Sequence, residues 1–85
     1  MLNENEVVNK IANYIGVDLR NIESKKLDED NAIYAWENIR GGKHFIVSED
    51  NSFLGASSAI SFEKLLEEFR NGKRSGNLQT INTNE

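Results

Sequence analysis

The chain has 85 residues, no cysteine, a single histidine and a formal net charge of -4 at pH 7. This length predicts one domain, and the composition excludes a disulfide framework or a thiolate metal site. The acidic balance argues against nucleic acid as a partner, and no apolar run reaches the roughly 20 residues that span a bilayer, so we expect a cytoplasmic protein without membrane attachment.

Residues 2–15 carry the signals of a helix. Asn3 can cap it and Glu6, three residues later, completes a capping box, while Gly16 provides a stop. Apolar residues recur at helical spacing along one side, namely Val7, Val8, Ile11, Ala12 and Ile15. We therefore expect an N-terminal amphipathic helix.

A solvated edge strand is expected over residues 22–27, followed by an acidic turn at residues 28–31. Residues 32–56 then form the centre of the fold, because two β-rich runs flank Gly41 and Gly42 and glycine pairs are typical of hairpin turns. A second turn near residues 49–52 leads to a further strand. The pattern predicts a four-stranded antiparallel meander.

A two-residue loop at Gly41 and Gly42 sets the register of the central hairpin. Trp36 then faces Val47, and one face of the sheet becomes the core, made of Tyr34, Trp36, Phe45, Val47 and Leu54. The opposite face is also strongly apolar, with Ile39, His44, Ile46 and Phe53 upon it. Either the N-terminal helix covers this second face, or it is left for a partner or a second copy of the chain.

The last predicted helix covers residues 62–71, with Ser58 or Ser61 as its cap. Its buried stripe is Phe62, Leu65, Leu66 and Phe69. Residues 75–85 are mostly polar, and we expect a flexible tail there. The fold class is thus α+β, in the order α-β-β-β-β-α, with a domain over residues 1–74, a tail over residues 75–85 and at least the C-terminal helix packed on the core face.

Motifs that carry chemistry are weak in this sequence. Ser57 and Ser58 lie between a strand and a helix, as a nucleophilic serine does, with His44 as the one available base. A helix cap is a simpler role for these serines than catalysis. In the same way, residues 40–43 are more simply a tight turn than a binding loop, and residues 28–31 are more simply a solvated turn than a metal-binding loop. We predict no enzymatic activity, no cofactor and no metal site.

A resemblance covers about half of the chain. It rests on Arg40-Gly41-Gly42, Phe45-Ile46-Val47, Asp50, Ser52-Phe53-Leu54, Ala56, Ser58, Phe69 and Gly72-Lys73-Arg74. These residues resemble short bacterial single-domain proteins without a characterised function, some of them similar to immunity proteins of toxin systems. The resemblance implies cytoplasmic neutralisation of a toxin by direct binding, and it assigns no catalytic residue.

The sequence therefore favours a small non-enzymatic protein-binding module, of an immunity or inhibitor type, with a protein partner or a homodimer. The candidate contact residues are Ile39, Arg40, Lys43, His44, Ile46 and Phe53. The alternative is a nucleic-acid-associated protein that binds through basic residues at the hairpin tip and at the end of the last helix. It requires six cations to lie on one face of the protein, namely Lys25, Lys26, Arg40, Lys43, Lys73 and Arg74.

Overall fold

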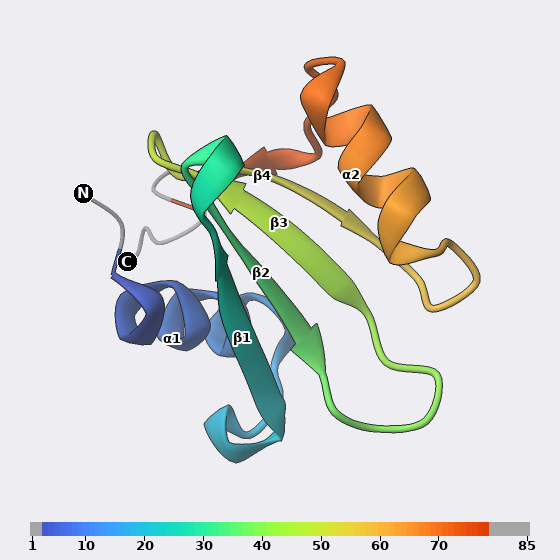
Figure 1. Cartoon of the computed structure of the whole chain (residues 1–85). Helices are drawn as coiled ribbons and strands as arrows, with labels where there is room; N and C mark the ends of the chain where they lie inside the picture. Colours follow the sequence, from blue (N-terminus) through green and yellow to red (C-terminus); the bar gives the residue numbers. More distant parts are fainter. Residues whose placement is uncertain (1–2, 79–85) are drawn as a thin grey trace.

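A computed structural model describes residues 3–78 as two helices and one five-stranded sheet (Figure 1). The strands form an antiparallel meander in the order β1-β2-β3-β4-β5. In chain order the elements are α1 (Glu4–Ile15), β1 (Ile22–Leu27), β2 (Ala32–Glu37), β3 (His44–Ser48), β4 (Ser52–Ala56), α2 (Phe62–Arg70) and β5 (Gly76–Asn77). The predicted α+β meander is confirmed, and β5 is added to it after α2.

Both helices begin and end where the sequence indicates. The side chain of Asn3 accepts hydrogen bonds from the amides of Asn5 and Glu6 at 2.8 and 3.2 Å. Gly16 ends α1 in the left-handed conformation, which glycine adopts without steric cost. Ser61 caps α2 by accepting from the amide of Lys64. Local sequence signals were sufficient for these boundaries.

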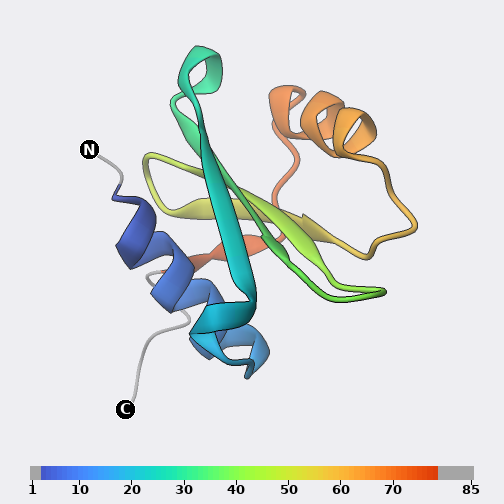
Figure 2. The same ribbon diagram turned by 60° about the horizontal axis from the view of Figure 1, so that its bottom comes forward.

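The two helices cover opposite faces of the sheet, as Figure 2 shows. The larger cluster lies between α1 and the sheet, and its buried members are Val7, Ile11, Ala12, Ile22, Ile33, Ala35, Phe45, Val47, Phe53 and Leu78. The smaller cluster lies under α2 and joins Ala32 and Ile46 to Leu65 and Phe69. Because each face is covered, the chain forms three layers rather than two.

The predicted register of the central hairpin is wrong. Trp36 pairs with His44 instead of Val47, a displacement of three residues, because the ladder closes at Glu37 and Lys43 and the loop spans residues 38–42. A two-residue turn of type I′ needs positive φ at both central residues, and of the two glycines only Gly41 has it, with φ 73°. An odd displacement exchanges the faces of one strand relative to the other.

The predicted faces are consequently wrong as well. Tyr34 and Trp36 share their face with Ile46 and Leu54, on the side of α2. Phe45 and Val47, expected on that face, lie with Phe53 on the side of α1. The turn between β3 and β4 has a three-residue loop, residues 49–51, and Asn51 takes a φ of 70° there.

The fold extends beyond the predicted boundary at residue 74. β5 pairs with the start of β4, where Gly76 faces Phe53, and the buried Leu78 donates its amide to the carbonyl of Asn51 at 2.8 Å. Residues 75–78 therefore belong to the domain and not to a tail. The remainder of the predicted tail, residues 79–85, lies outside the described residues.

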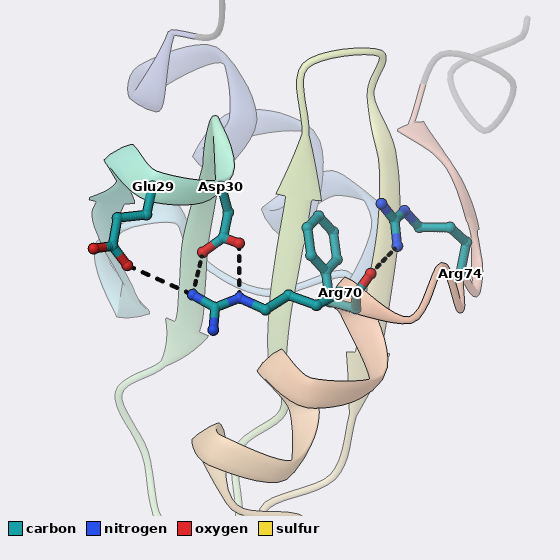
Figure 3. Close-up of polar contacts among 5 residues, drawn as sticks. Glu29, Asp30, Arg70 and Arg74 are labelled. Atoms are coloured by element: carbon teal, nitrogen blue, oxygen red, sulfur yellow. Dashed lines mark hydrogen bonds and ion pairs between the residues drawn. The ribbon is translucent and has the colours of Figure 1, made fainter.

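An ion-pair cluster ties the end of α2 to the turn after β1 (Figure 3). The guanidinium of Arg70 donates to both carboxylate oxygens of Asp30, at 2.8 and 3.0 Å, and lies 3.7 Å from Glu29. Nearby, the guanidinium of Arg74 lies 3.7 Å from the centroid of the Phe69 ring and donates to the Phe69 carbonyl. Asp30 thus links the acidic turn to α2, while Asp28, Glu29 and Asn31 are exposed to solvent as predicted.

Candidate functional site

An open cleft of about 320 Å³ lies between the β2–β3 loop and the segment that joins β4 to α2. Its floor comes from β2, the start of β3 and the first residue of α2, and the two loops form its sides. The residues that line it are Tyr34, Trp36, Glu37, Ile39, Gly41, Gly42, Lys43, His44, Ser58, Ile60, Ser61 and Phe62. Neither loop forms the cleft alone, because each supplies one wall.

The floor of the cleft is an aromatic cluster. The rings of Tyr34 and Trp36, two residues apart on one face of β2, stack with centroids 5.1 Å apart. Phe62, at the start of α2, tilts against Tyr34 at 4.5 Å. The three rings are only partly buried, so they present apolar and π-electron surface to the cleft.

His44 lies at the base of this cluster with 6% of its surface exposed. Its Nδ1 atom lies 2.9 Å from the hydroxyl of Tyr34. Its Nε2 atom is buried and has no hydrogen-bond partner, the one such side-chain atom within residues 3–78. An unpaired buried polar atom costs free energy, so its presence in a folded protein requires a specific explanation.

Burial lowers the pKa of His44 below its ordinary value of 6.5. The backbone of Ser57 and Ile60 offsets part of this effect, although neither residue meets Nε2 with ordinary hydrogen-bond geometry. Burial therefore favours the neutral form of the ring over the charged form.

We expect the single histidine to titrate below pH 6.5 in an NMR experiment on the folded chain. Because the unfolded chain then binds more protons, the free energy of unfolding should be highest above pH 6.5 and decrease as the pH falls from 6.5 through the lower folded pKa. His44→Phe should lose this part of the pH dependence. A measured pKa at or above 6.5 would contradict the neutral buried ring.

Two large apolar side chains stand at the sides of the cleft. Ile39, in the β2–β3 loop, is 51% exposed, and Ile60, before α2, is 40% exposed. Exposing side chains of this size costs hydration free energy, so a pair of them beside an aromatic floor is typical of a contact surface. Tyr14 and Leu19 are the other large apolar side chains exposed within residues 3–78, and neither lines the cleft.

The six candidate contact residues do not form one surface. Ile46 and Phe53 are 0% and 1% exposed, the first under α2 and the second under α1, so the predicted second apolar face is not available to a partner. The N-terminal helix covers only part of that predicted set. Ile39, Lys43 and His44 line the cleft, whereas Arg40 belongs to the same loop without lining it.

Four of the apolar residues that line the cleft were not among the candidates. Tyr34 and Trp36 were assigned to the core, and Phe62 to the buried stripe of the last helix, because their strand or helix spacing is that of core residues. Ile60 had a signal of its own: it is an isolated large apolar residue in a loop of serines and alanine.

The convergence of cations that nucleic-acid binding requires is not seen. Lys25 and Lys26 are neighbours in β1 and therefore point to opposite faces of the sheet. Lys73 pairs with Glu68 at 3.2 Å, and Arg74 lies against Phe69 and Ser52, at the end of β4 away from the β2–β3 loop. The described cations are thus distributed over several surfaces.

The arrangements considered for catalysis or metal binding are not assembled either. Ser57 Oγ accepts from the amide of Ala59, and neither ring nitrogen of His44 bonds to a serine hydroxyl in the described chain. Within residues 3–78, no three histidine, cysteine or acidic side chains are grouped as metal ligands. No helix in that range is long and apolar enough to cross a bilayer.

Two other hollows lie on the side of α1. One of about 480 Å³ is bounded by Tyr14 and Ser75, and one of about 520 Å³ lies between α1 and β1. The walls of neither contain a buried side-chain atom that lacks a partner. The aromatic cleft has both an unpaired buried atom, Nε2 of His44, and two exposed isoleucines, and we take it as the candidate site.

Comparison with known proteins gives no further information about this site. No family model, no curated protein and no solved structure matches the chain.

Proposed function

We propose that this chain is a small non-enzymatic protein-binding module, of an immunity or inhibitor type, and that the aromatic cleft is its contact surface. The observation that carries the proposal is the pair of exposed isoleucines, Ile39 and Ile60, on either side of the floor made by Tyr34, Trp36 and Phe62. A few clustered side chains, among which tryptophan and tyrosine are enriched, supply most of the binding free energy of protein interfaces.

The β2–β3 loop, which carries Ile39, is supported by contacts with the end of β2. Gly42 allows the β2–β3 loop to lie against Glu37, since a Cβ atom at Gly42 would come within 2.6 Å of the Glu37 Cβ. The Glu37 carboxylate accepts the Lys43 amide at 3.0 Å and holds the other end of the loop. A loop supported in this way presents Ile39 at little additional entropic cost, which favours binding.

The proposal is tested by affinity capture from an extract of the organism that carries the gene. Ile60→Asp should abolish capture of the partner, because it places a charge at the apolar wall of the contact. Leu19→Asp is the matched control: Leu19 is 44% exposed, close to the 40% of Ile60, and lies outside the cleft. It should retain the partner.

Two outcomes contradict the proposal. In the first, the wild-type chain captures no protein reproducibly. In the second, a protein is captured equally by the wild type and by Ile60→Asp while both are folded by circular dichroism. The immunity or inhibitor type further predicts that the captured protein loses an activity on binding, which an assay of that protein with and without the chain can measure.

A further inference from the structure

The charges around the cleft indicate what kind of partner segment it takes. Three carboxylates surround the aromatic floor. Glu37 lines the cleft, Glu23 lies directly opposite Trp36 in the β1–β2 ladder, and Glu63 follows Phe62 at the start of α2. None of the three forms an ion pair with a lysine or arginine of residues 3–78, although Glu37 accepts the Lys43 amide and Glu23 the Asn38 side chain.

Two lysines also lie at the cleft, against three carboxylates. The ammonium of Lys25 lies 5.4 Å from the centroid of the Phe62 ring, and Lys43 lies at the boundary between the cleft and the hollow bounded by Tyr14. At the floor itself, burial raises the pKa of the Tyr34 hydroxyl, and the charge of Glu63 raises it further. With a net charge of -4 for the whole chain, the cleft favours a cation over an anion.

The aromatic rings favour the same ligand chemistry. A cation over the face of a tryptophan or tyrosine is stabilised by the ring quadrupole, and arginine also stacks its planar guanidinium on such faces. The chain already uses this contact twice, at Arg74 on Phe69 and at Lys25 on Phe62. The methylene stem of a long basic side chain would in turn contact apolar walls such as Ile39 and Ile60.

We propose that the cleft receives a basic segment of the partner protein, with an arginine guanidinium against the rings of Tyr34 and Trp36 and its stem between Ile39 and Ile60. This inference rests on the proposed function, since it names the chemistry of the segment that the same cleft binds. Glu23, Glu37 and Glu63 supply the complementary charge.

Titration with blocked hexapeptides tests the inference, because Trp36 is the one tryptophan of the chain and reports on the cleft by its fluorescence. The probe is acetyl-Ser-Leu-Arg-Leu-Arg-Ser-amide. Its controls replace both arginines with citrulline, which keeps the shape without the charge, or with glutamate. The arginine peptide should give a saturable change, the citrulline peptide should bind about threefold more weakly or worse, and the glutamate peptide should not bind.

Variants of the protein provide the matched comparison. Glu63→Gln should weaken the arginine peptide by about threefold at low salt, an effect of the size expected for one exposed charge pair. Glu6→Gln should leave binding unchanged: Glu6 is likewise in the first turn of a helix, but α1 lies on the other face of the sheet. Both variants make the same change in net charge.

Three results overturn the inference: no fluorescence change with the arginine peptide at millimolar concentration, equal binding of the citrulline peptide, or tighter binding of the glutamate peptide. They are distinguishable from failure of the proposed function. If Ile60→Asp still releases the captured partner while the peptides give one of these results, the charge preference is wrong and the contact surface stands. If the arginine peptide binds but capture does not depend on Ile60, the proposed function fails.

Discussion

Ile46→Asp is expected to leave the protein unfolded. Ile46 is 0% exposed in the central strand β3 and packs beneath α2 with Leu65 and Phe69. Losing a buried isoleucine side chain costs about 2–5 kcal/mol, and a carboxylate without a partner in an apolar layer costs several more. The total reaches the free energy of unfolding of a chain of this size, about 5–10 kcal/mol. The measurement is urea unfolding followed by circular dichroism.

Ile39→Asp is the control for this result. The sequence places Ile39 on the same face as Ile46, but the structure places it in the β2–β3 loop with 51% of its surface exposed. Its free energy of unfolding should change by less than about 0.5 kcal/mol, as for other surface substitutions. If Ile46→Asp folds cooperatively with a midpoint near that of the wild type, the observed register and the position of α2 are wrong.

Gly55→Ala is expected to have the second largest effect, a loss of about 1–3 kcal/mol from overpacking. A Cβ atom at Gly55 would lie 2.6 and 2.7 Å from two ring carbons of Phe45, its partner in the β3–β4 ladder. The Phe45 ring is buried and packs edge-on against Tyr14 and Phe53, so a shift of the ring disturbs both of these contacts. Urea unfolding of the variant gives the difference directly.

Gly76→Ala separates this steric effect from a general effect of glycine in strands. Gly76 in β5 also faces a phenylalanine ring, but a Cβ atom there would lie 3.4 Å from the Phe53 ring, at ordinary contact distance. Its free energy of unfolding should stay within about 0.5 kcal/mol of the wild type or increase slightly, because alanine restricts the unfolded chain. Equal losses at Gly55 and Gly76 would contradict the close contact with Phe45.

The difference between the expected and the observed hairpin comes from one turn. Glycine pairs are compatible with several loop lengths, and the sequence does not state which residues close the ladder. The bond from the Glu37 amide to the Lys43 carbonyl, at 2.9 Å, excludes the two-residue loop. Because side chains alternate along a strand, this displacement was enough to assign Phe45 to the wrong face. Ile46 and Phe53 were joined by the second turn, whose three-residue loop places them on opposite faces, under different helices.

One sequence signal for the three-layer arrangement was present. Residues 44–47 form a continuous run that is buried in the structure, and such runs occur in strands covered on both faces, whereas a strand with one solvated face alternates. The run therefore favoured helices on opposite faces. The predicted register did not use this signal. It assigned residues 44–47 alternately to a core face and to an exposed apolar face.

The sequence by itself determined the elements whose causes are local. Asn3, Gly16 and Ser61 set the ends of the helices through caps that involve residues at most four positions away, and apolar spacing set which side of each helix is buried. The tertiary structure alone decided the register, the face that each helix covers and the cleft. These features depend on contacts between residues that are distant in sequence, such as the contact of Tyr34 with Phe62. Local sequence patterns do not predict the free energies of such contacts.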